Sequence, residues 1–422
     1  MARSLPLLRG IAVAATAGIV LAACGEGDNG AEPEAPAAPQ IEVKEGDGVL
    51  TIGSLLPDTG SLAFLGPPML AGVDLAVEDI NEAGGVLGKD VVREHADSGD
   101  TESNIAGAST DSLLAQKADV ILGAASSSVS LSVIDKIIGR DVAMISPANT
   151  SDQFTTYEDE GLYFRTAPPD KLQGRVLGDL VVSDGNAATC ILALQDAYGT
   201  GLADNTETAI QDAGGEVVEK IIYDPKAAEF SAEVSQVKAA GCQGIVIIGF
   251  AESTKIFAEL IKQGMPAPEF NWYLVDGNTN NYGDDLPEGT LEGAKATFPS
   301  AEVKPDFEER LTEINEDVRV TLYGPESYDA AILVALAAIA AGNDSGTAIA
   351  SKLQEVSSGG EKCTTFADCK ELLEEGTDID YDGISGPIEF NEAGDPAEAT
   401  IAINEFGADN NYEAIEYRSG KI

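Results

Sequence analysis

Three segments of the sequence carry polar residues that suit the binding of a small charged solute. The serines at 126–128 follow an apolar run and open a predicted helix, where hydroxyl and free amide groups favour a carboxylate. One of them is equally well explained as the cap of that helix. Thr150 and the carbonyl groups around Ala148 follow the next apolar run and suit a second ligand group, although an ordinary turn has the same composition. Asp276 comes directly after another apolar run, where its carboxylate would face a ligand ammonium or would merely form a turn.

The composition argues against catalysis and against nucleic-acid binding. The 422 residues include a single histidine, His95, which removes most Ser-His-Asp mechanisms and most histidine-ligated metal sites. A hydrolase that used Ser126 would need a base, and His95 lies inside a predicted strand. The 72 acidic residues against 25 basic ones give a net charge of −47, which phosphates would repel. We expect no enzyme activity, no cofactor, no metal and no nucleic-acid partner.

The first residues are typical of an export signal. Arg3 and Arg9 precede the apolar run 11–23, which is shorter than the ~20 residues of a membrane-spanning helix. The run ends in Leu-Ala-Ala followed by Cys24, and this resembles the lipobox of bacterial lipoproteins, in which the cysteine thiol receives a diacylglycerol. The alternative is an ordinary signal peptide with a coincidental cysteine. We predict a signal peptide over 1–23 and a lipid anchor on Cys24 at the outer face of the cytoplasmic membrane.

Residues 24–48 are predicted to be a flexible tether, because proline, glycine, alanine and acidic residues cannot bury a core. Beyond Cys24, four cysteines remain in an oxidising compartment. Cys363 and Cys369 lie in a predicted polar loop, and their short separation predicts a disulfide. Cys190 and Cys242 lie at two predicted strands, so they pair only if those strands are neighbours; otherwise they are buried thiols.

From residue 49 onward, short apolar runs alternate with stretches of helical periodicity. This alternation predicts an α/β fold with parallel sheets that are covered on both faces. Strands are expected over 49–55, 91–95, 120–122, 142–145, 189–194, 217–223, 245–248 and 272–275. Helices are expected over 70–81, 105–115, 129–138, 172–182, 203–213, 232–240 and 256–263, and after residue 299 over 306–315, 325–341 and 347–356. A terminal hairpin is expected between 387–390 and 400–405.

Five segments together resemble the Leu/Ile/Val-binding family of solute-binding proteins, which serves ABC transporters. They are 52–60 (IGSLLPDTG), 71–86 (AGVDLAVEDINEAGGV), 165–170 (RTAPPD), 198–203 (YGTGLA) and 230–232 (FSA). Each motif alone is modest, but their order and separations are those of the family, and the resemblance covers nearly the whole mature chain.

The resemblance implies the type I periplasmic-binding-protein fold, with two Rossmann-like lobes joined by a three-segment hinge. It divides this chain into a first lobe of 49–167 plus 298–383 and a second lobe of 168–297 plus 384–422. The three hinge crossings are expected near 167–169, 296–299 and 381–386.

The resemblance also implies which residues bind the ligand: Phe64, Leu65, Ser126, Ala148, Thr150, Tyr198, Phe250 and Asp276. Ser126 matches the serine that binds the ligand α-carboxylate, and Ala148 and Thr150 match the groups that bind both ammonium and carboxylate. Asp276 matches an acidic residue that faces the ammonium, while Tyr198 and Phe250 match aromatic residues of the second lobe. Leu65 departs from the tyrosine of some members, so the resemblance does not settle the side-chain pocket.

We therefore expect a lipid-anchored, monomeric receptor that captures a small amino acid, branched-chain or related, and presents it to a membrane permease. A second hypothesis keeps the fold but replaces the ligand by an amide, urea or an aromatic acid. Asp276 argues against the acids, because its carboxylate would repel an anion that lacks an ammonium. A third hypothesis is a sensory receptor that serves no permease. The sequence does not distinguish among side chains of the ligand.

Overall fold

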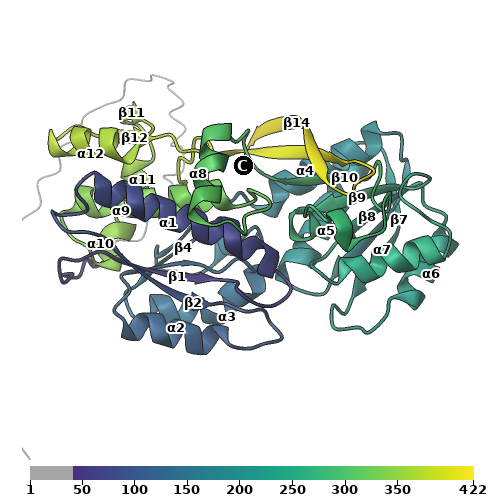
Figure 1. Cartoon of the computed structure of the whole chain (residues 1–422), viewed down its shortest axis with the longest axis horizontal. Helices are drawn as coiled ribbons and strands as arrows, with labels where there is room; N and C mark the ends of the chain where they lie inside the picture. The colour runs from purple at the N-terminus through teal and green to yellow at the C-terminus, as the bar shows by residue number, and fades with distance from the viewer. Residues whose placement is uncertain (1–40) are drawn as a thin grey trace, which may run out of the picture. The chain divides into compact units, whose positions relative to one another are not determined.

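The computed structural model describes residues 41–422, which form two main β-sheets surrounded by helices (Figure 1). The first sheet has five parallel strands in the order β2-β1-β3-β4-β5. These strands are β1 (Thr51–Leu56), β2 (Val92–Asp97), β3 (Val120–Gly123), β4 (Ala143–Ser146) and β5 (Tyr163–Arg165). Every residue of β1, β3, β4 and β5 is buried, as expected of parallel strands covered on both faces.

Helices cover both faces of the first sheet. In Figure 1, α1 and α9 lie on one side of β1, and α2 and α3 lie on the other. The helices of this half are α1 (Gly66–Glu82), α2 (Ala106–Ala115), α3 (Ser127–Ile138), α8 (Pro305–Ile314), α9 (Gly324–Ala341), α10 (Gly346–Ala350), α11 (Leu353–Val356) and α12 (Phe366–Glu374). Both α8 and α9 pack against α1, although they are far from it in sequence. Residues 305–374 therefore complete the half that the first strands begin.

The second sheet has seven strands in the order β14-β13-β10-β9-β8-β6-β7. Strands β6 to β10 are parallel to their neighbours, whereas β13 runs antiparallel to β10 and to β14. The strands are β6 (Ala188–Leu194), β7 (Glu216–Tyr223), β8 (Gly244–Ile248), β9 (Asn271–Val275), β10 (Lys295–Pro299), β13 (Glu398–Phe406) and β14 (Tyr412–Lys421). The helices are α4 (Asp170–Ser183), α5 (Ala197–Asp212), α6 (Ser231–Ala240) and α7 (Ser253–Lys262). Helix α4 packs on α5, and α6 packs on α7.

The chain passes between the two sheets three times. Residues 166–169 lead from β5 to α4, residues 300–304 lead from β10 to α8, and residues 382–397 lead from β12 (Ile379–Tyr381) to β13. Strand β12 belongs to a small separate sheet with β11 (Glu361–Cys363). Three chain segments therefore link the half around the first sheet to the half around the second.

Helix α9 is a core helix. Among the described residues it alone combines 18 residues with a mean hydropathy of 1.2, enough by length and composition to cross a membrane. However, 83% of it is buried inside the protein, and its alanine-rich surface lets α1 approach closely: a Cβ on Gly72 would lie 2.3 Å from the Gly324 carbonyl oxygen. Its apolar character therefore reflects packing between α1 and the first sheet.

The alternation of strands and helices was predicted correctly, but β5 and β10 of the two main sheets were missed, as were the short β11 and β12. Strand β5 is Tyr-Phe-Arg, and its charged Arg165 is buried only because it pairs with Asp395. Strand β10 begins with Lys295 and ends with Pro299, so neither strand shows an apolar run. In addition, the helix expected over 203–213 begins earlier, at Ala197, and the one expected over 347–356 is split into α10 and α11.

The predicted terminal hairpin was wrong. Strand β13 pairs with β14 at the chain end, whereas 387–390 forms only isolated bridges on either side of a turn. Pro387 has no N–H to give a sheet, which disfavours a strand there. Strand β14 was not recognised because it lies at the sheet edge, where most of its side chains are exposed and polar.

The predicted tether was also too long. Lys44 donates its backbone N–H to Thr347 Oγ1 (2.8 Å), and Gly48 donates to Asp344 Oδ2 (2.7 Å). Asn343 and Ser345 each donate from their side chains to the Lys44 carbonyl. Residues 44–48 are therefore held on the loop before α10, since backbone groups can bind protein partners even where the side chains bury little. The signal peptide, Cys24 and the rest of the tether lie outside the described residues.

Both candidate disulfides are present. Cys190 and Cys242 are joined, because β6 and β8 are neighbours and bring the two Cα atoms to 5.6 Å. Cys363 and Cys369 are joined with a Cα separation of 5.4 Å. The segment around this second bridge is not the polar loop that was expected, since it forms β11 and α12, and Thr365 caps α12 by accepting from the Asp368 amide.

Removing the two disulfides should destabilise the protein unequally. The Cys190–Cys242 bridge spans 52 residues and the Cys363–Cys369 bridge spans 6. On loop-closure grounds, the double alanine variant of the first should lose about 4 kcal/mol of unfolding free energy and that of the second about 2 kcal/mol. Urea unfolding of both variants measures the difference. Equal losses, or alkylation of either pair without reductant, would contradict this assignment.

Candidate functional site

Two loops at the ends of neighbouring strands of the first sheet form one side of a small cavity. Ser126 follows β3 and caps α3, its side-chain oxygen accepting from the Val129 amide (3.4 Å). Ala148 and Thr150 lie in the loop after β4. All three line the same cavity and are at most 6% exposed. Because the Ser126 oxygen acts as an acceptor for the cap, its O–H remains available as a donor.

The other side of the cavity comes from the second sheet. Asp276 follows β9 directly, Tyr198 lies in the first turn of α5, and Phe250 lies in the loop after β8. The rings of Tyr198 and Phe250 are stacked, with centroids 5.6 Å apart and an interplanar angle of 9°. Residues that follow strands of both sheets therefore line one cavity. Open α/β sheets bind their ligands at this position, beyond the carboxyl ends of the strands.

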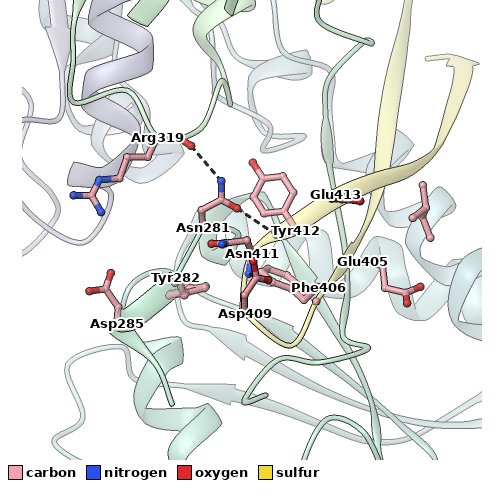
Figure 2. Close-up of a pocket in the computed structure, with 13 residues that line it drawn as sticks. Asn281, Tyr282, Asp285, Arg319, Glu405, Phe406, Asp409, Asn411, Tyr412 and Glu413 are labelled. Atoms are coloured by element: carbon pink, nitrogen blue, oxygen red, sulfur yellow. Dashed lines mark hydrogen bonds between the residues drawn. The ribbon is translucent and has the colours of Figure 1, made fainter. Parts of the chain in front are cut away.

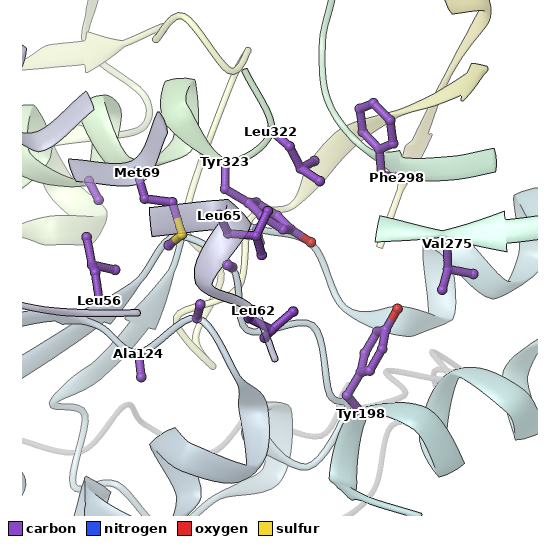
Figure 3. Packing of buried hydrophobic residues seen from close by; sticks show 14 of the residues in the cluster. Leu56, Leu62, Leu65, Met69, Ala124, Tyr198, Val275, Phe298, Leu322 and Tyr323 are labelled. Atoms are coloured by element: carbon purple, nitrogen blue, oxygen red, sulfur yellow. The ribbon is translucent and has the colours of Figure 1, made fainter. Parts of the chain in front are cut away.

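Asp276 is the polar centre of the cavity. Its Oδ1 accepts from Gln173 Nε2 (2.8 Å) and from the Tyr198 hydroxyl (2.8 Å), and its Oδ2 accepts from the Tyr323 hydroxyl (2.9 Å). Figure 3 shows Tyr198 and Tyr323 on opposite sides of this space, beside Leu62 and Leu65. Burial raises the pKa of Asp276, and the three donors oppose that rise.

A second carboxylate lies close behind the first. Asp170, the first residue of α4, is fully buried, and neither of its carboxylate oxygens has a hydrogen-bond partner. Burial raises the pKa of Asp170, and the charge of Asp276 raises it further. Among the described residues, those that line the cavity include no lysine, arginine or histidine. Asp276 is therefore a carboxylate with no basic side chain among the residues that line its cavity.

Seven of the eight predicted ligand-binding residues line this cavity, and Phe64 does not. Phe64 is partly buried against the core instead. Residues 63–65 form a single 3-10 turn, in which positions three apart lie on the same side. Leu62 and Leu65 therefore face the cavity together, and Leu62 takes the place that the sequence assigned to Phe64.

The three adjacent serines do not share one task, contrary to the expectation that all three suit a carboxylate. Ser126 caps α3 and lines the cavity with Ser127. The Ser127 oxygen accepts from the Ser151 amide (3.3 Å), which links the two first-sheet loops. Ser128 donates to Asp196 Oδ2 (3.1 Å) and accepts from the Ala197 amide (3.0 Å), so it bonds the N-terminus of α5.

Several residues of the site were missed from the sequence. Tyr323 directly precedes α9 and has a positive φ of 61°, and Gln173 is one of several polar residues of α4. The remaining missed lining residues are Leu62, Ala125 and Gly277. The Gly324-Pro325 pair marked the start of α9, but nothing in the sequence placed Tyr323 beside Asp276.

The single histidine takes no part in the site. His95 lies in β2, where its Nε2 is 2.9 Å from Asp58 Oδ2 and its Nδ1 is 3.0 Å from Ser54 Oγ. It does not line the cavity, so Ser126 has no histidine base. Within residues 41–422, no group of three His, Cys, Asp or Glu side chains is arranged to hold a metal ion.

Size alone does not mark the site. A much larger hollow, of about 1040 Å³, lies between residues 281–285, Arg319 and the tip of the β13–β14 hairpin (Figure 2). Asn281 spans it by donating to the Arg319 carbonyl (3.2 Å) and accepting from the Tyr412 amide (3.2 Å). Most of its charged side chains are exposed, so it lacks the desolvated polar groups that give a ligand site its specificity.

The cavity around Asp276 leaves only about 10 Å³ between its side chains. That is close to the space of one water molecule. A solute can reach Asp276 only if the elements of the two sheets move apart.

Comparison with known proteins agrees with this architecture. The model of a family described as "Periplasmic binding protein" matches residues 49–405. Among curated proteins, the Leu/Ile/Val-binding protein homolog 3 of Brucella melitensis is 31% identical over 52% of this chain, and the match spans 59% of that protein's length. The chemotactic signal transduction system substrate-binding protein BasB of Halobacterium salinarum is 27% identical over 82% of this chain and 84% of its own.

Solved structures match over most of the chain. The leucine-binding protein LivK of Thermotoga maritima has a TM-score of 0.73 at 20% identity, covering 87% of this chain and 98% of its own. A solute-binding protein of an ABC transporter from R. palustris, solved with benzoate, has a TM-score of 0.70 at 17% identity, covering 89% of this chain and 98% of its own. At these identities the likeness shows the fold, and it confirms the predicted two-lobed α/β architecture.

Replacing Asp276 by asparagine should stabilise the free protein at neutral pH. A carboxyl whose pKa is raised by folding binds more protons in the native state, so it lowers stability as pH rises above its unfolded pKa of about 4. The Asp276→Asn variant should melt at a higher temperature at pH 7 and lose less stability between pH 4 and pH 7. Thermal melts across this range test it, with the exposed Asp378→Asn as control. A lower melting temperature of the variant at pH 7 would contradict this prediction. It would show that the three hydrogen bonds stabilise the ionised carboxylate by more than burial destabilises it.

Proposed function

The chain belongs to the periplasmic binding protein family, and we propose that it is the solute receptor of an ABC importer, binding a small amino acid between its two sheets. The family and its structural neighbours are binding proteins, so the protein is an extracytoplasmic solute receptor and not an enzyme. The observation that carries the proposed ligand is Asp276. It is a buried carboxylate that lines the cavity without a basic partner.

The ammonium of an amino acid supplies the positive charge that the cavity lacks. A charged group that leaves water needs paired, hydrogen-bonded partners, and the Asp276 carboxylate is the charged partner available. The bound ammonium would in turn favour the ionised form of Asp276 and oppose the rise in its pKa that burial causes. Ligand charge and site charge are thereby neutralised together.

The carboxylate of the ligand is assigned to the first-sheet side. The Ser126 hydroxyl, the Thr150 hydroxyl and the amide groups at the start of α3 are neutral donors, and the helix N-terminus favours an anion. Ala148 offers its carbonyl to the ammonium from the same loop. Leu62, Leu65, Tyr198 and Phe250 enclose the remainder and suit an apolar side chain, which favours branched-chain or related amino acids.

Binding is proposed to proceed by closure of a hinge formed by the three chain crossings. The cavity draws residues from both sheets, so a solute makes its full set of contacts only when the two sides are together. Such a ligand shifts the population toward the closed form by its additional contacts there. The lobe limits expected from the sequence were 49–167 plus 298–383 and 168–297 plus 384–422. Because Phe298 and Pro299 belong to β10 of the second sheet, we propose that the second lobe extends to residue 299, with the protein acting as a monomer.

Two observations support alternative ligands or roles. The raised pKa of Asp276 would reduce its repulsion of an aromatic acid, and the R. palustris neighbour of the same fold was solved with benzoate. An amide or urea would also satisfy neutral donors and Asp276. A relative named for chemotactic signal transduction makes a sensory role the second candidate function. A thermal-shift screen over amino acids, amides, urea and aromatic acids distinguishes the ligands, since a ligand at 100 times its Kd adds about 2.7 kcal/mol of stability.

Asp276→Ala should abolish tight binding of the best amino acid from that screen. The variant leaves a desolvated ammonium unpaired, at a cost of roughly 2 to 5 kcal/mol, or about 30-fold to several thousand-fold in Kd. Ser126→Ala removes one hydroxyl donor to a charged group and should cost less, about 1.5 to 3 kcal/mol. Isothermal titration measures both, with Asp409→Ala as an exposed control. An Asp276→Ala protein within about threefold of the parent would rule out an ammonium ligand.

We also propose that Cys24 carries the lipid anchor, on the basis of the residues that precede it. A Cys24→Ala protein should be exported but released from the membrane fraction, because a single diacylglycerol group provides the attachment. Membrane fractionation followed by immunoblotting tests this. Retention of the intact variant on membranes at the parental level would contradict the proposal.

A further inference from the structure

Asn149 lies between Ala148 and Thr150, yet its side chain does not line the cavity. It is fully buried, and its Nδ2 donates to the carbonyls of Ala124 and Ala125, each at 3.0 Å. These carbonyls belong to the loop that carries Ser126. The side chain of one ligand loop is therefore hydrogen-bonded to the backbone of the other.

Every hydrogen-bonding group of Asn149 is engaged. Its Oδ1 accepts from the Tyr163 hydroxyl (3.0 Å), its amide donates to Ser146 Oγ (3.0 Å), and its carbonyl accepts from Arg165 Nη1 (3.2 Å). Tyr163 is itself held by stacking on Phe154, with ring centroids 4.6 Å apart. Asn149 thus has a single well-determined position.

Arg165 fixes the backbone on both sides of Thr150. Its Nη1 also donates to the Ser151 carbonyl (2.8 Å), while its Nε pairs with Asp395 Oδ1 (2.6 Å). Neither side chain of this ion pair is exposed to solvent. Asp395 comes from the third chain crossing, so that crossing supports the loop that carries Thr150.

We infer that Asn149 is a positioning residue for the carboxylate end of the ligand, buttressed by Tyr163 and by the Arg165–Asp395 pair. A carboxylate bound by both Ser126 and Thr150 needs the two loops at a fixed separation, and Asn149 sets that separation. Residues that lock binding groups in place contribute to affinity without touching the ligand. This inference rests on the proposed function, because it assumes that the solute carries a carboxylate.

The test compares two probes, L-leucine and L-leucinamide, which differ in the carboxylate alone. Asn149→Ala should weaken leucine by about 10- to 100-fold but leucinamide by less than threefold, because misplaced loops harm only the carboxylate contact. The preference for leucine over leucinamide should then largely disappear. If Asn149→Ala fails to fold, Tyr163→Phe, which removes one buttressing hydroxyl, should reduce the preference several-fold.

The matched control is Asn186→Ala. Asn186 is also buried, and its side chain bonds the Val181 carbonyl and the Tyr273 hydroxyl in the second-sheet half. The Asn186→Ala variant should lose stability but keep the parental preference for leucine over leucinamide. An Asn149→Ala protein that folds and keeps that preference, or loses leucine and leucinamide equally, would overturn the inference.

The outcome for the parent protein separates this inference from the proposed function. A parent that binds no amino acid but binds benzoate refutes the amino-acid ligand, and the benzoate and benzamide pair then tests Asn149 in the same way. A parent that binds no carboxylate of either kind refutes both.

Discussion

One carboxylate, Asp276, is buried without a positive partner, and the rest of the site is arranged around that constraint. Taking an ionised carboxylate out of water is costly unless donors replace the lost hydration. The three donors are neutral and come from separate elements: Gln173 of α4, Tyr198 of α5 and Tyr323 before α9. They satisfy the oxygens without cancelling the charge. Under the proposed function, this remaining charge is what favours a solute that brings a cation.

The two ends of the proposed ligand are supported in different ways. The carboxylate end rests on loops of a single sheet that are joined by Asn149 and held by the buried Arg165. The Asn149 contacts lie within the first-sheet loops, while Arg165 is itself paired with Asp395 of the third chain crossing. The ammonium end rests on Asp276, whose donors come from both halves of the chain. The Asn149 contacts need no residue of the second sheet, whereas Asp276 has its full set of hydrogen bonds only when the halves are together.

Much of the fold and most of the site could be predicted, because both follow from short-range patterns. Apolar runs marked the buried strands, and residues directly after those strands had to gather at one edge, which is why Ser126, Thr150 and Asp276 were found. The failures have a common cause in long-range pairing. Strand β14 is polar because it lies at an edge, and β5 contains Arg165, whose burial depends on Asp395 some 230 residues away. A local sequence pattern does not predict which distant residue will pair with a given strand or side chain.

Tyr323 illustrates the same limit and bears on how tightly a ligand binds. It directly precedes α9, which packs with α1 on the first sheet, yet its hydroxyl donates to Asp276 after β9 of the second sheet. An ammonium that approaches Asp276 competes with this hydroxyl for the same carboxylate. Under the proposed function, ligand binding therefore exchanges a hydrogen bond from a neutral hydroxyl to the carboxylate for one from a cationic ammonium, and the affinity depends on the difference between them. Because the exchanged bond links the two halves, a ligand that displaces Tyr323 must itself replace that link for the closed form to persist.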